Sequence, residues 1–192
     1  MSTIYALSSG RGRAGIAIVR VSGPEAGTAM RALVGKQPRP RQATSTGIHA
    51  ADGSLIDRGL VLWFPAPASV TGEDVGEFHV HGGLAVVNAI LVALSAVPKL
   101  RAAEAGEFTR RAFQNGKLDL TQVEAVADLI AAETQSQRLQ AARQLDGELG
   151  RMLGTWRAET LRALAYVEAA IDFAEDELPE DVVTEKVRKT IE

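Results

Sequence analysis

Three charged residues that lie far apart in the chain, Arg20, Glu77 and Lys117, each allow either a ligand-binding role or an ordinary structural one. Arg20 follows an apolar run that we expect to be a strand, and a guanidinium beside the core requires either an internal carboxylate or a ligand anion. Glu77 either faces solvent on its strand or accepts two parallel N–H donors from an amidine-like edge, such as that of a pterin or a guanine. Lys117 precedes an expected helix, where it reaches an anionic ligand, caps a neighbouring helix by its charge, or is an ordinary surface lysine.

The segment around Glu77, residues 71–83, places carboxylates, imidazoles and glycines about a short apolar alternation. On a strand, Glu77, His79 and His81 share one face, while the apolar residues between them point to the core. These three side chains resemble part of a metal site, but the chain has three histidines in all, no cysteine and no second ligand cluster. We therefore expect hydrogen-bonding histidines in a polar pocket and no bound metal.

The sequence lacks the motifs of a nucleotide-hydrolysing or acyl-transfer site. It contains no Gly-x-x-x-x-Gly-Lys-Ser/Thr phosphate loop, and the segment Gly10, Arg11 and Gly12 lacks the third glycine and the flanking elements of a dinucleotide-binding turn. A Gly-x-Ser-x-Gly motif and cysteine nucleophiles are also missing. We therefore expect no nucleotide hydrolysis by these residues, and the motifs identify no catalytic residue.

The hydrophobic pattern predicts a protein without a membrane segment. The longest apolar run, residues 84–97, is too short to span a bilayer and contains Asn88 and Ser95. The N-terminus has no signal-peptide pattern. The absence of cysteine suits a cytoplasmic setting, so we expect a soluble, cytoplasmic protein.

Charge and composition change along the chain. Residues 1–117 contain 13 lysines and arginines against 8 acids, whereas residues 118–192 contain 8 against 16. The basic half either favours an anionic partner such as RNA or is simply well solvated. The second half begins a stretch of good helix formers that has no proline until Pro179. We therefore predict two domains, residues 1–117 and 118–192.

Periodicity and turn signals predict an α+β protein, with an N-terminal α/β domain built on a mixed sheet and an all-α segment after it. In the first domain we expect strands at 3–7, 16–21, 46–51, 60–64 and 99–103, and one that includes residues 77–81. We expect helices that run from the capping-box residues 22–25 to residue 34, over 84–97, and from 106 to about 115. In the second we expect helices at 120–133 and 135–173, the longer one with a buried apolar stripe, then an acidic loop at 172–181 and an amphipathic segment at 182–192.

The motifs of this chain, taken in order, closely resemble those of the family of the tRNA modification GTPase MnmE, also called TrmE. The matching segments are residues 15–23, 62–65, 71–74, 81–83, 106–113, 115–120, 122–130 and 167–173. They cover nearly the whole chain with compatible spacing. The resemblance implies an N-terminal folate-binding domain that also forms a homodimer, followed by the first part of a helical domain.

In that family a GTPase domain, with its GTP, potassium and magnesium, is inserted into the helical domain, and the chain ends in a cysteine-bearing motif. Both are absent from these 192 residues, so the resemblance implies a fragment or truncated form that is not catalytic alone. The family's cofactor is 5-formyltetrahydrofolate or a related one-carbon folate, and its contact positions fall on Arg20, Glu77 and Lys117. The resemblance also implies that the full protein acts with the flavoprotein MnmG, or GidA, on carbon 5 of the wobble uridine of tRNA.

A different class of function remains open, that of a protein–protein interaction module that binds no folate. In such a module the acidic helices and the basic first half serve partner docking. Binding of a folate distinguishes the two interpretations.

Overall fold

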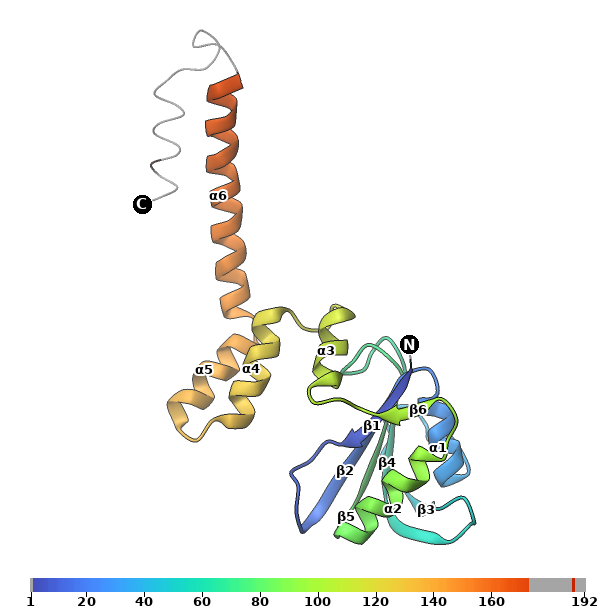
Figure 1. Cartoon of the computed structure of the whole chain (residues 1–192). Coiled ribbons are helices and arrows are strands. Elements are labelled where there is room, and N and C mark those ends of the chain that lie inside the picture. The colour runs from blue at the N-terminus through green and yellow to red at the C-terminus, as the bar shows by residue number, and fades with distance from the viewer. Residues whose placement is uncertain (1, 173–187, 189–192) are drawn as a thin grey trace. The chain divides into compact units, whose positions relative to one another are not determined.

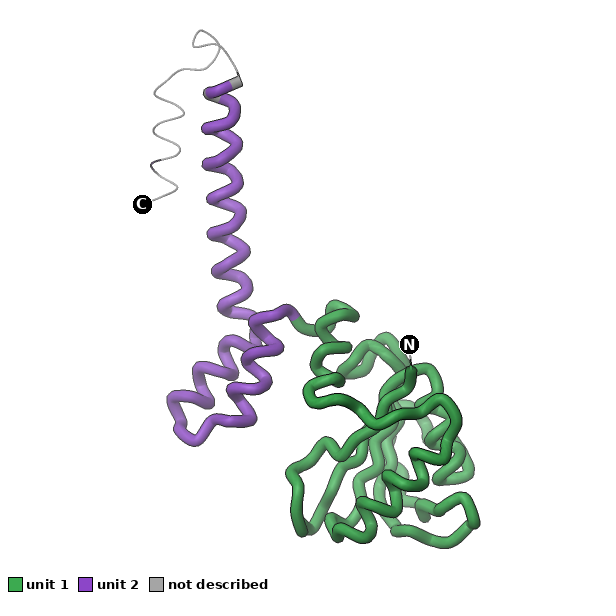
Figure 2. Tube along the Cα trace, in the orientation of Figure 1, with its two compact units in different colours: residues 1–118 green, residues 119–192 purple. Residues whose placement is uncertain are grey.

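The computed structural model describes residues 2–172 and residue 188. The chain divides into two compact units, Met1–Leu118 and Asp119–Glu192, which Figure 2 colours separately. The expected acidic loop at 172–181 and the amphipathic segment at 182–192 lie outside the described residues, apart from Asp172 and Arg188. Within the described residues, no helix combines the length and the apolar character needed to cross a membrane.

The described part of the N-terminal unit contains both strands and helices, intermixed along the chain (Figure 1). In chain order they are β1 Thr3–Leu7, β2 Ala14–Ser22, α1 Ala26–Val34, β3 Thr44–His49, β4 Leu55–Phe64, β5 Val75–Gly82, α2 Leu84–Ser95, β6 Leu100–Ala102 and α3 Glu107–Gln114. Each strand and helix that the sequence predicted for this unit is present, with ends that differ by a few residues.

The strands form one mixed sheet in the order β3-β4-β5-β2-β1-β6. β1 and β6 run parallel, and the other neighbouring pairs are antiparallel. The helices α1 and α2 share a single apolar core with the buried side chains of β2 and β5, so they cover the same face of the sheet. The predicted α+β class and mixed sheet are confirmed.

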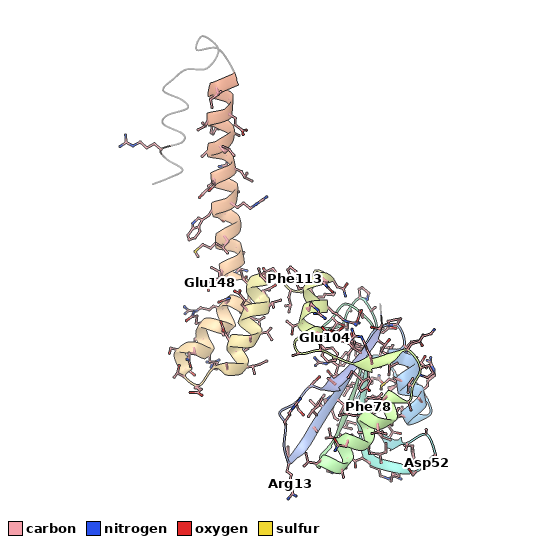
Figure 3. All side chains as sticks on the ribbon, viewed as in Figure 1. Arg13, Asp52, Phe78, Glu104, Phe113 and Glu148 are labelled. Atoms are coloured by element: carbon pink, nitrogen blue, oxygen red, sulfur yellow. The ribbon has the colours of Figure 1, made fainter. Side chains whose placement is uncertain are left out.

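Alternation along the two central strands separates core side chains from polar ones. Val19 and Val21 of β2 are fully buried, as is Phe78 of β5, which Figure 3 labels within the N-terminal unit. Arg20 and Glu77, each one position removed, therefore point to the opposite face of the sheet. The sequence predicted correctly which residues face the core. A shift of the strand register by one residue would expose all of these apolar side chains, so the register is strongly specified.

The first helix begins later than its capping-box spacing predicted. Ser22 is the last residue of β2, and its hydroxyl bonds to the loop before β5 instead of capping a helix. α1 starts at Ala26, after Glu25, whose side chain accepts no backbone N–H of the helix. The helix ends as expected at Gly35, which adopts the left-handed conformation with φ of 75°.

The described part of the C-terminal unit is helical, with α4 Leu120–Ala131, α5 Gln135–Leu145 and α6 Glu148–Asp172. α4 and α5 each begin with the predicted capping box. The side chains of Asp119 and Thr134 each accept the backbone N–H of the third helical residue, whose own side chain bonds back to the cap. The sequence therefore located both helix starts correctly.

The single long helix predicted at 135–173 is wrong. It is interrupted after Leu145, where Gly147 adopts φ of 80° and ends α5 before α6 begins. Glycine adopts this left-handed conformation at little cost because it has no Cβ. Gly147 therefore lies between two helices where one was expected.

The apolar stripe that was expected to be buried is exposed. On α6, Trp156 is 54% exposed, and Leu161, Leu164 and Ile171 are exposed as well. Spacing alone predicted the stripe correctly, but within residues 119–172 only its first part, at Ala142, Leu145 and Leu149, is partly buried. The prediction of burial is therefore wrong for the described part of this unit.

Candidate functional site

Arg20 and Glu77 lie opposite each other on the central strands β2 and β5. Arg20 Nη2 is 2.7 Å and Arg20 Nε is 2.9 Å from Glu77 Oε1. The Glu77 side chain is only 13% exposed, and the guanidinium offsets part of the cost of removing this carboxylate from water. Arg20 thus has an internal acid as its partner, and Glu77 is not a merely solvated strand residue.

His79 is the second partner of Glu77. Its Nε2 lies 3.0 Å from Glu77 Oε2, and because an ionised carboxylate only accepts hydrogen bonds, this nitrogen must carry the hydrogen. Burial raises the pKa of Glu77, but the hydrogen bonds from His79 and Arg20, together with the charge of Arg20, outweigh it and hold the pKa below its ordinary value. The carboxylate is therefore ionised at neutral pH and held at both oxygens.

His81 shares the strand face of His79 but belongs to a different pair. Its Nδ1 lies 2.9 Å from Asp57 Oδ1 on β4, and its ring is 74% exposed. Its backbone N–H also donates to Asp57 Oδ2, at 2.8 Å. In residues 2–172, no three histidine or acidic side chains gather as a metal-binding group would. The two histidines thus hold separate acids.

Lys117 lies just past the end of α3 and has no ion pair with the Arg20–Glu77 pair. Its backbone N–H donates to Ala112 O at 2.8 Å. Its stem runs beside Gly72, where an added Cβ would lie 3.3 Å from Lys117 Cε. The structure therefore brings Arg20 and Glu77 together and leaves Lys117 over the loop before β5.

That loop is tied to β2 close to Arg20. Ser22 lies two residues beyond Arg20 on the same face, and its hydroxyl is 2.7 Å from Thr71 Oγ1 and donates to Glu73 Oε2 at 2.7 Å. The side chain of Asn115, at the end of α3, donates to Thr71 O at 2.7 Å. The loop thus joins β2 to the end of α3.

Three residues of α3 belong to this region although the sequence did not single them out: Glu107, Phe108 and Arg111. The ring centre of Phe108 is 5.6 Å from the guanidinium carbon of Arg20, within reach of a cation–π contact. Arg111 Nη1 lies 3.0 Å from Glu73 Oε2, and its Nη2 lies 3.0 Å from Glu107 Oε1. The signal that the sequence did contain is the four-residue spacing of Glu107 and Arg111, which pairs opposite charges on one helix face.

Glu107 is buried and strongly acidic. Hydrogen bonding from Arg101 outweighs the effect of burial, and together with the backbone N–H of Glu104 and the guanidinium of Arg111 it lowers the pKa of Glu107 to about 2. Arg101 Nη1 lies 2.8 Å from Glu107 Oε2. This carboxylate is therefore ionised at neutral pH and fastens the start of α3 to β6. Figure 3 labels Glu104 just ahead of α3.

The arrangement suits binding of a ligand. Glu77 can accept from a flat ring with adjacent N–H donors, while Phe108 offers an aromatic face and Arg20 a cation beside it. Oε1 of Glu77 already accepts two N–H groups from Arg20, and Oε2 accepts one from His79. A ring with two donors must therefore displace at least one of the hydrogen bonds from Arg20 to Glu77. With Lys117 over the adjoining loop, the ligand that fits is a donor-edged heterocycle with an anionic substituent.

Two cavities of the described chain are separate from this site. A mainly apolar cavity of about 520 Å³ is lined by Tyr5, Val87 and Leu91, among others, on the face of the sheet that the helices cover. Neither Arg20 nor Glu77 lines it. A second hollow, of about 590 Å³, is lined by residues of α5 and α6 in the C-terminal unit.

Comparison with known proteins gives matches along both units. Residues 3–117 match the family model of the GTP-binding protein TrmE N-terminus, and residues 120–192 match that of the MnmE helical domain. The chain is 58% identical over 189 residues to the tRNA modification GTPase MnmE of Parvibaculum lavamentivorans. The matched region covers 95% of this chain and 42% of that protein.

Mitochondrial relatives are equally similar. The chain is 57% identical over 191 residues to the 5-taurinomethyluridine-[tRNA] synthase subunit GTPB3 of Danio rerio, covering 99% of this chain and 38% of that protein. It is 57% identical over 188 residues to the human protein of the same name, covering 96% and 38%. The chain thus spans about two fifths of the length of these relatives.

Proposed function

This chain belongs to the MnmE family of tRNA modification GTPases, and from that membership we propose that its N-terminal unit binds 5-formyltetrahydrofolate, or a related one-carbon folate, at Arg20, Glu77 and Lys117. In the full-length protein this folate supplies a one-carbon unit for modification of carbon 5 of the wobble uridine. The same unit mediates homodimerisation. The role of this chain's own residues is to bind and orient the cofactor.

The observation that carries the proposal is the Arg20–Glu77 pair on a polar strand face, with Phe108 beside the cation. A pterin carries a ring N–H and an exocyclic amino group along one edge, and this edge matches the two oxygens of a carboxylate. Its pyrimidine ring is flat and can lie against an aromatic face. The residues present fit a folate once Arg20 releases part of Glu77.

Each side chain has a separate role in this proposal. Glu77 accepts from the pterin edge, and His79 fixes the orientation of its second oxygen. Arg20 and Lys117 meet the polar or anionic parts of the folate, such as the carboxylates of its glutamate tail. The three residues surround one ligand from β2, β5 and the end of α3.

Isothermal titration with 5-formyltetrahydrofolate tests this assignment. The wild-type chain is expected to bind, and Glu77→Ala and Arg20→Ala are each expected to weaken binding by at least about tenfold, because each removes a charge-assisted contact. Lys117→Gln is compared with Lys99→Gln, since Lys99 is an exposed lysine of the same unit that pairs with Glu25. Wild-type affinity in both alanine variants would refute the site.

The whole protein has further proposed partners. The remainder of the full-length chain supplies the GTPase domain, with GTP, potassium and magnesium. Its partner is the flavoprotein MnmG, its substrate is tRNA, and we expect it in the cytoplasm. Homodimerisation is measured on this chain by analytical ultracentrifugation, where a concentration-dependent dimer is expected and a monomer at every concentration would contradict it.

A second class of function is favoured by α6. Its exposed apolar residues, Trp156 and Leu164 among them, form a stripe of the kind that contacts other proteins. In that interpretation the chain is an interaction module and binds no folate. Equilibrium dialysis against radiolabelled 5-formyltetrahydrofolate separates the two, because only the folate-binding chain retains the label.

A further inference from the structure

Arg111 is the centre of a buried ion network in the N-terminal unit. Its side chain is 7% exposed and bonds to acids on two segments. Nη1 lies 3.1 and 3.0 Å from the two oxygens of Glu73, and Nη2 lies 3.0 Å from Glu107 Oε1. Glu107 is bonded in turn to Arg101 of β6. The network therefore joins β6, α3 and the loop before β5.

Stability alone is a poor explanation for such a network. A buried ion pair loses about as much in desolvation as its attraction returns, and packed apolar residues often stabilise a fold equally well. A guanidinium adds fixed geometry, because its N–H groups form a rigid fork that holds acids in set directions. The network thus points to a role in placing the segments that it joins.

The segments that Arg111 joins both reach the proposed ligand site. Glu73 accepts a hydrogen bond from Ser22, which lies two residues beyond Arg20 on β2. Phe108 lies three residues before Arg111 on α3, and its ring faces the Arg20 guanidinium at 5.6 Å. Arg111 therefore fixes the distance between the strand that carries the cation and the helix that carries the aromatic ring.

We propose that Arg111 is a positioning residue for the folate site: it clamps α3 to the loop before β5 and so holds Phe108 against Arg20, and Phe108 is the surface on which the ring of the ligand lies. This inference rests on the proposed function for the identity of the ligand. Phe108 contacts the folate, whereas Arg111 acts through Phe108. Without the clamp, α3 keeps its ties at Glu107 and Asn115, but the ring is held less firmly against Arg20.

Two adjacent arginines provide a matched pair of variants. Arg111→Lys keeps the positive charge but loses the fork that reaches Glu73 and Glu107 together. Arg110→Lys changes the next residue of the same helix, which is exposed, pairs with Glu104 at 2.8 Å and reaches Glu107 only at 3.8 Å. A difference between the two variants therefore reports the buried geometry and not the charge of the helix.

Isothermal titration with 5-formyltetrahydrofolate is the first measurement. Arg111→Lys is expected to weaken binding at least about fivefold, and Arg110→Lys to stay within about twofold of wild type. Glu73→Gln, which keeps an oxygen acceptor but loses the charge, is expected to weaken binding in the same direction, and it replaces Arg111→Lys if circular dichroism shows that the latter is unfolded. Wild-type affinity in both variants overturns the proposal.

A double-mutant cycle with Phe108→Leu tests whether Arg111 acts through Phe108. If it does, the loss of affinity in the double variant is smaller than the product of the two single losses, because the second substitution removes an interaction that is already broken. Losses that simply multiply would show independent roles and would contradict the proposed route.

The Arg20 Nε–H resonance reports the placement of Phe108 in the absence of folate. The aromatic ring shifts this resonance, and Phe108→Leu removes the shift. Arg111→Lys is expected to move the resonance in the same direction, and Arg110→Lys to leave it in place. An unmoved resonance in Arg111→Lys overturns the positioning role alone, whereas failure of the wild-type chain to bind 5-formyltetrahydrofolate refutes the proposed function.

Discussion

Arg20 and Glu77 bond to each other across β2 and β5, with Arg20 Nη2 at 2.7 Å from Glu77 Oε1. The two side chains assigned to the folate are therefore already each other's partner. A ligand whose edge donates to Glu77 competes with Arg20, and its own anionic groups offer Arg20 a new partner. Binding of the proposed folate would thus exchange partners and leave neither charge unpaired.

Substitution of His79 tests whether the orientation of Glu77 matters for binding. His79→Ala removes the N–H donor to Glu77 Oε2 and is expected to weaken folate binding by about tenfold, because hydrogen bonds to charged groups are the stronger ones. His79→Gln can donate from a similar position and is expected to recover most of the affinity. Equal affinity of His79→Ala and wild type, measured by isothermal titration, would contradict this role.

The buried acid Glu107 makes stability depend on pH. Its pKa of about 2 in the folded chain lies below its ordinary 4.5, so between these values the unfolded chain binds more protons than the folded chain. The stability from this group is complete above pH 4.5 and is lost as the pH falls toward 2. Glu107→Gln is therefore expected to flatten the acid limb of the stability curve.

The same variant is expected to lose about 3 kcal/mol of unfolding free energy at neutral pH, because it leaves Arg101 and Arg111 without their shared acid. Urea unfolding at a series of pH values measures both effects. Glu104→Gln, at an exposed acid three residues away, controls for the loss of one negative charge. An acid limb in Glu107→Gln as steep as that of wild type would show that Glu107 is not the linked group.

Two glycines of the C-terminal unit are expected to respond to alanine in opposite directions. Gly147→Ala places a Cβ on a residue with φ of 80° and is expected to cost about 1 kcal/mol. Gly154→Ala, inside α6 with nothing beyond the adjoining helix backbone within 4 Å of the added Cβ, is expected to stabilise the helix by about 0.5–1 kcal/mol. Hydrogen exchange of the α5 and α6 amides measures both, and stabilisation by Gly147→Ala would indicate one continuous helix.

Two glycines of the sheet differ in what an added methyl would meet. At Gly59 the Cβ would lie 2.2 Å from the backbone oxygen of His79, which cannot move without separating β4 from β5. At Gly76 it would lie 2.6 Å from Sδ of Met30, a buried side chain that can shift more easily than a backbone oxygen. Gly59→Ala is expected to lose about 3 kcal/mol of unfolding free energy and Gly76→Ala clearly less, and the reverse order in urea unfolding would contradict the packing described.

Local sequence patterns predicted correctly those features that depend on a single strand or helix. The alternation around Glu77 predicted that Glu77 and His79 face away from Phe78, because successive strand residues must point to opposite faces. The capping residues Asp119 and Thr134 located two helix starts, because their hydrogen bonds span only three residues.

Contacts between residues far apart in the chain could not be predicted from the sequence. Arg20 required an anion, but which one depended on a strand order that sets β2 beside β5. Ser22 matched a capping box, yet its hydroxyl bonds to Thr71 in a loop 49 positions away. Trp156 has the spacing of a buried stripe, and spacing carries no information on whether a second surface lies against it.

Electron density for 5-formyltetrahydrofolate in a crystal of this chain is the most direct measurement of the central claim. The expected result is a pterin with its donor edge at Glu77 and its ring against Phe108, and with Arg20 turned in part from Glu77 to the ligand. Folate density in the cavity lined by Tyr5 and Leu91, with Arg20 still bonded to Glu77 as it is here, would contradict the account.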